Sequence, residues 1–488
     1  MKQKTPGLLQ HYFTIMQAAN KSNDGNRCMI APHPDLKKKL KDELKKLKRQ
    51  LGSSVLSNIL TPLGKTKLGL NDGLLRPGKS FPLGMSASRA IAVAGNRAPL
   101  TGTLKVMVVL VDFSDKAIAN PKKHYDDLFF SEGVIATGSV KEYYKEVTNG
   151  LVNISGQVVG PYRMPKTMTA YAHGESGTGE AKPNARTLAE DAAKAANSIV
   201  DFSQYDNDQD GYVDAFVVIH AGTGAEETGK GSDIWSHKWL LPTVYNADGT
   251  HVYAYLTVPD DCKLGVCAHE LGHLLFGFPD LYDDDYSSEG IGDWCLMAGG
   301  SWNNGGLTPA HPCGWCKAQQ NWVNTVTLSS NKKAVSIPDV KDSNTIYRLW
   351  KDGSSGSEYF LAENRTKKNY DKFLPGEGLL IYHIDDAMDS NSNELHYKVA
   401  LLQADGKKQL ETGANRGDTS DTWPGTANKK TFSGSSKPNS KSYGNIKTDV
   451  AIRKIKNAAG TITADMFVKP GAALAPVKNK LKTKGNMR

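Results

Sequence analysis

The sequence predicts an α+β protein in which a mixed unit of strands and helices is followed by a β-rich unit. Between residues 101 and 325, apolar runs of strand type alternate with segments of helix type. After residue 325, short β-branched and aromatic runs are separated by Gly, Asn, Asp and Ser turns. At 488 residues the chain is also too long for one typical core. We therefore expect two or three domains.

Residues 1–100 precede the first predicted strand and are expected to form an N-terminal helical and extended segment. Leucines recur in it at helical spacing, at Leu36, Leu40, Leu44, Leu47 and Leu51. Asp35 is the expected N-cap of this helix, and Gly52 is its expected C-cap. The Gly/Pro/Ser-rich residues 71–99 are expected to be a linker or an extended segment.

The elements of the mixed unit, residues 101–325, follow from local signals. A β-branched apolar run at residues 104–113 predicts a buried strand. Ser139 and Glu142 have the spacing of a capping box for a helix that stops at Gly150. Two further elements are expected after it, a strand at residues 152–160 and an alanine-rich helix at residues 184–200.

Residues 326–470 are expected to form a β-rich, sandwich-like domain. Its apolar runs are short and lie at residues 334–340, 345–350, 358–365, 378–385, 397–405, 450–455 and 461–468. Residues 471–488 are basic and are expected to form a disordered tail.

The composition is that of an ordinary globular protein, and no apolar run approaches the length needed to cross a bilayer. The formal charge is +9, but much of the excess lies in residues 35–50 and 477–488, where no aromatic residues are interleaved. This pattern favours an amphipathic helix lying on another surface over a nucleic-acid or membrane patch. Residues 1–23 contain no uninterrupted apolar stretch and are a poor secretory signal.

A histidine pair has the spacing of a metal site. His269-Glu270-Leu271-Gly272-His273 is HExxH, and residues i and i+4 share one face of a helix, so both imidazoles can bind one Zn²⁺. Glu270 can then act on the attacking water as general base and pass the proton to the leaving amine. A third ligand must come from elsewhere. The alternative is a buried helix with two hydrogen-bonded histidines, but the apolar flanks are typical of a zinc-site wall and favour the metal.

The six cysteines are too few for a disulfide framework. Five of them surround the histidine motif in sequence: Cys262, Cys267, Cys295, Cys313 and Cys316. Their spacing does not choose between disulfides in an oxidising compartment and thiols. A structural zinc site built from Cys262, Cys267, Cys313 and Cys316 has acceptable pair spacings, although it would place a second Zn²⁺ next to the first.

Several long motifs together resemble one family. HELGHLLFGFPDLYD at residues 269–283, IGDWCLMAGGSW at 291–302 and TPAHPCGWCK at 308–317 are similar to the immune inhibitor A family of secreted metalloproteases, a metzincin-like group. The likeness extends over most of the chain. It implies a zincin/metzincin-like catalytic domain, an N-terminal propeptide and an extracellular location, although the chain carries no clear signal peptide.

Carried over residue by residue, the resemblance implies His269 and His273 as zinc ligands and Glu270 as the general base. Asp280 would be the third zinc ligand, because the family's usual form is HExxHxxGxxD. Met297 would be the methionine of the turn beneath the metal, for which the alternative is an ordinary core methionine.

The sequence departs from that form by one residue. Phe276 occupies the place expected for glycine, Gly277 follows it, and Asp280 lies one residue late. One more step of helix before Gly277 would absorb the extra residue, because glycine readily adopts positive φ at a helix end. Asp283 remains a competing ligand, and the GFPD match favours Asp280. His311, in the TPAHP stretch, is a candidate contact for substrate or for the transition-state oxygen, or else a structural hydrogen-bonding group.

An acidic loop suggests a second ion. Its oxygen donors follow the first nine positions of a calcium loop, at Asp206, Asp208, Asp210, Tyr212 (through its backbone carbonyl) and Asp214. Gly211 allows the bend, but position twelve is Val217 rather than a bidentate glutamate, and a predicted strand follows. We expect a structural Ca²⁺ site completed from outside the loop, with an Asp/Gly turn as the alternative.

Cys28 is the only cysteine far from these motifs in sequence, and it is a candidate latch. Its thiolate would take the open zinc position and keep an enzyme latent, and the alternative is a cysteine without such a role. The sequence as a whole predicts a monomeric zinc-dependent endopeptidase that acts on polypeptides. The competing hypothesis is a non-catalytic, zinc-containing surface-binding or adhesion module of the same fold. Glu270 argues against it, because a site that only binds zinc does not require this carboxylate.

Overall fold

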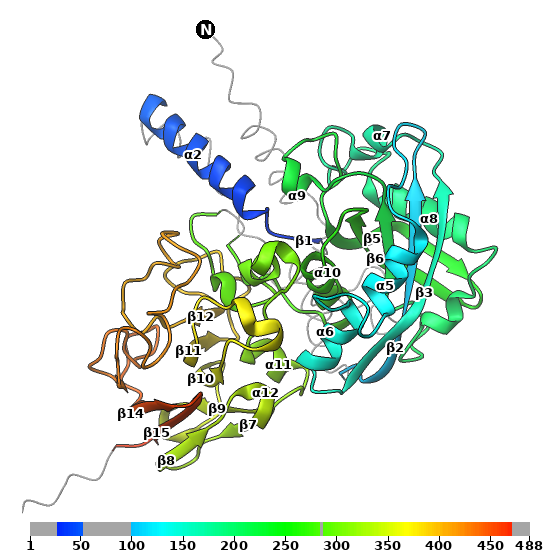
Figure 1. Ribbon diagram of the computed structural model, residues 1–488. Coiled ribbons are helices and arrows are strands. Elements are labelled where there is room, and N and C mark those ends of the chain that lie inside the picture. The colour runs from blue at the N-terminus through cyan, green and yellow to red at the C-terminus, as the bar shows by residue number, and fades with distance from the viewer. Residues whose placement is uncertain (1–26, 52–98, 284–285, 471–488) are drawn as a thin grey trace, which may run out of the picture.

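The computed structural model describes residues 27–51, 99–283 and 286–470, and its strands form three sheets with helices around them (Figure 1). The first sheet belongs to the first half of the described chain, and the other two sheets belong to the second half. The expectations for Gly52, for nearly all of the linker at 71–99 and for the tail at 471–488 lie outside the described residues.

The first sheet has six strands in the order β1-β5-β6-β4-β2-β3. They are β1 (Cys28–Met29), β2 (Gly102–Asp112), β3 (Val152–Arg163), β4 (Phe216–His220), β5 (His237–Ala247) and β6 (Thr250–Pro259). Strands β3, β2, β4 and β6 are parallel, β5 is antiparallel to β6, and β1 is antiparallel to β5. Strand β2 lies between β3 and β4, which explains why its sequence is a continuous apolar run.

The α-helices are α2 (Pro34–Leu51), α5 (Lys122–Phe130), α6 (Val140–Val147), α7 (Met168–Ala172), α8 (Ala185–Ala196), α9 (Ala225–Thr228), α10 (Leu264–Phe276), α11 (Gly314–Gln319) and α12 (Val340–Ser343). The 3₁₀ helices are η1 (Phe202–Tyr205), η2 (Gly292–Trp294), η3 (Gly299–Gly306), η4 (Lys351–Gly353) and η5 (Asn369–Phe373). In Figure 1, α10 lies between the six-stranded sheet and the C-terminal sheets, and α2 projects from the molecule beyond β1.

The predicted helix signals have mixed outcomes. The capping box before α6 is confirmed, since Ser139 accepts from the backbone N–H of Glu142 and the Glu142 side chain accepts from that of Ser139. The leucine-spaced helix is also present as α2, with Leu36 and Leu40 buried. Its predicted N-cap is wrong, because the helix already begins at Pro34 and Asp35 lies inside its first turn, as proline permits.

The C-terminal strands are β7 (Asn324–Thr327), β8 (Lys332–Ile337), β9 (Thr345–Leu349), β10 (Glu358–Arg365), β11 (Gly378–Asp385), β12 (Val399–Leu401), β13 (Thr431–Phe432), β14 (Ala451–Ala458) and β15 (Thr461–Phe467). They form a five-stranded sheet in the order β12-β11-β10-β9-β7 and a four-stranded sheet in the order β13-β14-β15-β8. The second half of the described chain is therefore rich in strands.

The five-stranded sheet is a middle layer. On β10, Phe360 packs into the apolar cluster shared with the four-stranded sheet, whereas Leu361 packs into the large core that also contains α10. On β11, Ile381 and Tyr382 divide in the same way. Because successive side chains on a strand point to opposite faces, this sheet is buried on both sides. No helix in the part of the chain that the structure describes is long and apolar enough to cross a membrane.

Candidate metal centre

The two histidines of the HExxH motif face a carboxylate from the segment after their helix. Helix α10 is buried along its whole length and places His269 and His273 one turn apart, with their Nε2 atoms 2.9 Å from each other. The Oδ1 atom of Asp280 lies 3.1 Å from His269 Nε2 and 3.2 Å from His273 Nε2. Two imidazole nitrogens and one carboxylate oxygen thus converge.

Backbone carbonyls orient both imidazoles. The Nδ1 atom of His269 lies 3.0 Å from the carbonyl oxygen of Leu296, and that of His273 lies 2.6 Å from the carbonyl oxygen of Phe278. A carbonyl only accepts, so each ring donates its Nδ1–H and turns Nε2 toward Asp280. Nε2 is then the nitrogen with which each neutral imidazole would bind a metal, in the arrangement that zinc-binding histidines require.

The turn after α10 accounts for the extra residue in the motif. The helix continues through Phe276 and ends at Gly277, which has φ +63°. The N–H of Gly277 donates to the carbonyl of His273 and that of Phe278 to the carbonyl of Gly272, so the helix ends at a left-handed glycine. This turn brings Asp280 back to the histidines. Asp283 accepts instead from the side chain of Ser287 and the backbone of Ser288.

Met297 lies directly beneath the helix. It is fully buried, and a Cβ atom added to Gly272 would sit 2.9 Å from its Sδ atom. Its carbonyl accepts from the N–H of Leu281, and the carbonyl of the preceding Leu296 accepts from His269. The turn thus holds both the helix and the segment that leads from it to the carboxylate.

Glu270 is buried beside this cluster, and neither of its carboxylate oxygens has a hydrogen-bond partner among the described residues. Burial, followed by the nearby Asp280 carboxylate, raises the pKa of Glu270 well above its ordinary value. An unpaired buried carboxylate is costly, whereas a bound cation with its water would satisfy it. Two neutral imidazoles and a carboxylate are also the donor set of a catalytic Zn²⁺ site, so the residues fit that metal.

A short N-terminal strand covers this cluster. Strand β1 is the edge strand of the six-stranded sheet and pairs with β5 through Cys28 opposite Lys238 and Met29 opposite His237. The pairing places the Cys28 Sγ atom within 4.8 Å of ligand atoms of His273 and Asp280. The candidate latch and two predicted zinc ligands, far apart in the sequence, therefore form one group.

Further hydrogen bonds hold the segment after Cys28 over the cluster. The backbone of Ile30 donates to the carbonyl of Ser236 at 3.2 Å and accepts from the Trp235 indole at 2.9 Å. The Trp302 indole donates to the carbonyl of Ala31 at 2.8 Å, and the Tyr282 hydroxyl donates to that of Met29. These bonds use backbone groups that an extended peptide of any sequence also offers.

Comparison with known proteins adds an independent observation. Residues 98–328 match the model for the catalytic domain of immune inhibitor A, peptidase family M6. These residues, called the peptidase segment below, are similar to the catalytic domain of the immune inhibitor A peptidase family. The chain is 33% identical over 261 residues to immune inhibitor A of Bacillus thuringiensis subsp. alesti, covering 42% of this chain and 38% of that protein. It is 30% identical over 291 residues to the pre-pro-metalloprotease PrtV of Vibrio cholerae serotype O1, covering 47% of this chain and 32% of that protein. The chain therefore matches about a third of the length of these relatives.

The acidic loop of the peptidase segment brings three predicted calcium ligands together. Carboxylate oxygens of Asp206, Asp208 and Asp210 lie within 4.8 Å of one another. The loop's own N–H groups bind these carboxylates, for example Gly211 to Asp206 at 2.8 Å and Tyr212 to Asp210 at 2.9 Å. Asp214 is buried and accepts at 2.6 Å from the N–H of Asn207.

His311 of the peptidase segment has partners on both ring nitrogens. Its Nε2 lies 2.8 Å from Glu146 Oε1 and its Nδ1 lies 2.9 Å from Lys317 Nζ. Burial lowers the pKa of Lys317 to about 8 and raises that of Glu146 to about 7. In this arrangement neither ring nitrogen is left for a substrate, so the structural alternative is favoured for His311.

Sequence reasoning missed the residues that surround His311. Asp371 accepts from the backbone N–H of His311 at 3.0 Å, and Arg365 donates to Asp371 and to the carbonyl of Trp294. Arg365 stands on β10, in the motif EYFLAENR. A charged residue at the end of an apolar strand was the signal available, but its partners are distant in sequence.

Proposed function

We propose that this chain is a zinc-dependent endopeptidase. One observation carries the proposal: His269, His273 and Asp280 converge within 3.2 Å of one another beside a buried Glu270, whose carboxylate has no hydrogen-bond partner in the part of the chain that the structure describes. The peptidase family of residues 98–328 supports it. So does the name of the Vibrio relative, which is a metalloprotease.

Bound Zn²⁺ would supply Lewis-acid polarisation of the scissile carbonyl and of the attacking water. His269, His273 and Asp280 would hold it, and the carbonyls of Leu296 and Phe278 keep both imidazoles in the required tautomer. Glu270 takes the proton from the attacking water at a carboxylate oxygen and passes it to the leaving amine. Its burial raises its proton affinity, which suits that role.

Hydrolysis of an unstructured protein such as casein tests the proposal. Wild type, Glu270→Ala and the control Glu227→Gln, at an exposed glutamate, are compared after limited proteolysis of the N-terminal segment, with zinc content measured on each. We expect about one zinc at the histidine site in all three and no hydrolysis by Glu270→Ala alone. Zinc without hydrolysis in the treated wild type would favour the non-catalytic binding or adhesion module. No zinc at the histidine site in any of the three proteins would contradict both functions.

We propose further that residues before the peptidase segment form a propeptide and that Cys28 is its latch. The support is the position of Cys28 beside His273 and Asp280, together with the pairing of β1 with β5. A peptide substrate adds to a sheet edge through the same backbone groups. The segment therefore occupies the place where we expect the substrate to bind.

The Cys28→Ser variant, with Cys262→Ser as a matched control, tests the latch. In cobalt-substituted protein, Cys28→Ser should lose a sulfur-to-metal charge-transfer band that Cys262→Ser keeps. The intact Cys28→Ser chain should also cleave casein at least about tenfold faster than wild type. Identical cobalt spectra for wild type and Cys28→Ser would contradict a thiolate latch.

We also propose that Asp206, Asp208, Asp210, Tyr212 and Asp214 bind a structural Ca²⁺ ion. The convergence of three of these carboxylates supports the assignment. Calcium should raise the unfolding temperature of wild type but not of Asp208→Asn. An equal effect on both proteins would point to a plain Asp/Gly turn.

The remaining parts of the proposal follow the family. We propose an extracellular, monomeric enzyme with a metzincin-like catalytic domain at residues 101–325, whose substrates are polypeptides. The name of the Vibrio relative and the sheet-edge geometry support a peptide substrate.

A further inference from the structure

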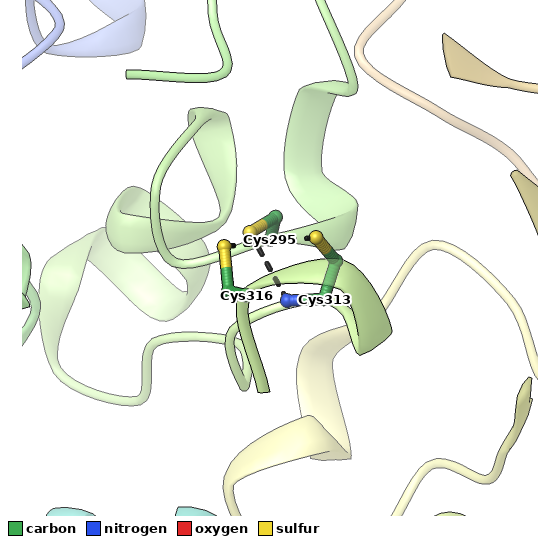
Figure 2. A group of neighbouring side chains, drawn as sticks. All are labelled: Cys295, Cys313 and Cys316. Carbon is green, nitrogen blue, oxygen red and sulfur yellow. Dashed lines mark hydrogen bonds between the residues drawn. The ribbon is translucent and has the colours of Figure 1, made fainter. Parts of the chain in front are cut away.

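Three cysteines form a second group of candidate metal ligands (Figure 2). Cys295 follows η2, Cys313 is the N-cap of α11 and Cys316 lies in the first turn of that helix. All three are fully buried, and their Sγ atoms lie within 4.8 Å of one another. The four-cysteine site considered from the sequence is not formed, because Cys262 and Cys267 are not part of this group. Their Sγ atoms lie 3.4 Å from each other instead.

The spacing of the sulfurs matches metal coordination. The Sγ atoms of Cys313 and Cys316 lie 3.8 Å apart. Two sulfurs on one tetrahedral cation lie about 3.8 Å apart when each metal–sulfur bond is about 2.3 Å. A disulfide would need about 2.05 Å and would leave the third cysteine unused. The three side chains therefore suit one shared cation better than a covalent pair.

The backbone favours negative charge on the central sulfur. The N–H groups of Cys313 and Met297 point at Cys295 Sγ, at 3.2 and 3.4 Å. These two hydrogen bonds stabilise negative charge on Cys295 Sγ, and the thiolate is the form in which a cysteine binds a metal.

Buried cationic residues bind or flank the segments that carry these cysteines. Arg365 donates to the carbonyl of Trp294, which directly precedes Cys295, and lies 3.4 Å from the carbonyl of His311, two residues before Cys313. Lys317 directly follows Cys316 and is buried. No histidine, aspartate or glutamate among the described residues joins the group. Three sulfur ligands without a nitrogen or oxygen ligand select soft d¹⁰ cations.

We propose that Cys295, Cys313 and Cys316 bind a thiophilic d¹⁰ cation, Zn²⁺ or Cu(I), as a structural site separate from the histidine site. Cys295 begins the turn that carries Leu296 and Met297, and the other two ligands belong to α11. The cation would therefore fasten the turn beneath the histidine motif to this helix. The site does not depend on peptidase activity.

The test uses the full chain with both His269→Ala and His273→Ala, purified anaerobically, so that the histidine site cannot contribute. We expect this protein to retain about one Zn²⁺ or Cu(I) per chain, with X-ray absorption showing sulfur neighbours at about 2.3 Å. The absorption edge distinguishes zinc from copper. Adding Cys316→Ser should weaken binding by about a hundredfold or more, and the matched control Cys267→Ser should not.

Two results would overturn the proposal. One is a His269→Ala/His273→Ala protein that contains no metal and in which the thiols of Cys295, Cys313 and Cys316 all react with a thiol reagent after unfolding. The other is a Cys313–Cys316 disulfide, found by peptide mass spectrometry, together with no binding of added Zn²⁺ or Cu(I) after this disulfide has been reduced. The absorption measurement needs no substitution at the three cysteines, so a folding defect in Cys316→Ser leaves the test intact.

Discussion

At the scale of single residues, the choice between two aspartates defines the proposed zinc site. Asp280 lies 3.1 Å from His269, whereas the Asp283 carboxylate accepts from Ser287 and Ser288. Asp280→Asn should weaken zinc binding by about a hundredfold, because a neutral amide replaces the charged ligand. Asp283→Asn should change it little. Chelator competition measures both constants, and the opposite ranking would assign the third ligand to Asp283.

A second residue-scale prediction concerns pH. Glu226 is 1% exposed, and burial raises its pKa to about 7 from an ordinary value near 4.5. The folded state keeps a proton that the unfolded chain loses, so this stabilisation is complete below about pH 4.5 and disappears as the pH rises through about 7. When the pH is raised from 5 to 8, the free energy of unfolding of the wild type should therefore fall by about 2–3 kcal/mol more than that of Glu226→Gln.

Urea unfolding at the two pH values measures this difference. Glu227→Gln is the matched control, because Glu227 is the exposed neighbour in the same helix. Equal pH dependence in wild type and Glu226→Gln would show that this carboxyl does not titrate as its burial demands.

At the scale of elements, two lysines on α2 hold the N-terminal segment to the peptidase unit. Lys37 and Lys41 each lie 2.5 Å from a different oxygen of Glu289, and Lys37 and Glu289 are nearly buried. Glu289→Gln would leave Lys37 buried without its partner, which costs about 3–5 kcal/mol for a buried pair. We expect α2 to undock and proteases to cleave the segment at least about tenfold faster.

Limited proteolysis followed over time checks this prediction. Lys38→Ala and Lys39→Ala serve as controls, because both lysines are exposed on the same helix. Unchanged cleavage of Glu289→Gln would mean that β1 and the bonds around Ile30 suffice to hold the segment.

The elements also show what the sequence could predict. The capping box at Ser139 and the apolar run of β2 were predictable, because local hydrogen bonding and a continuous apolar pattern determine them. Strand β1 was not, since two residues carry no periodicity and its partner β5 is about two hundred residues away. The extra helical step at Phe276 was predictable only as a consequence of Gly277.

The candidate site divides along the same line. HExxH and its carboxylate lie within twelve residues of each other, so their spacing carries the geometry. The group around His311 could not be predicted, because Glu146, Lys317 and Asp371 come from three distant segments. The cysteine group was not predicted, and the four-cysteine site considered as an alternative has other members, since spacing does not tell which cysteines the fold brings together.

At the scale of the whole molecule, the five-stranded sheet belongs to two cores at once. Its strand β10 ends at Arg365, which is fully buried and reaches out of the sheet to the peptidase unit. Arg365 donates to Asp371 and to the carbonyl of Trp294, and Asp371 holds the backbone of His311. The C-terminal sheet therefore supports both ends of the segment that carries Met297.

Arg365→Met should for this reason weaken the metal centre from a distance. It leaves Asp371 buried with Lys341 as its remaining charged partner, and breaking such a pair costs about 3–5 kcal/mol of unfolding free energy.

Loosening the segment between Trp294 and His311 also frees the Leu296 carbonyl that orients His269. Zinc affinity should fall by about 10–100-fold, as it does when such an outer partner is lost. Arg348→Met on the neighbouring strand β9 is the control, because Arg348 is partly exposed and contacts the carbonyls of Ser354 and Gly356 and the ring of Tyr359. Chelator competition and urea unfolding measure the two effects, and a variant that lost stability while keeping its zinc affinity would show that the C-terminal sheet supports the fold without positioning the metal ligands.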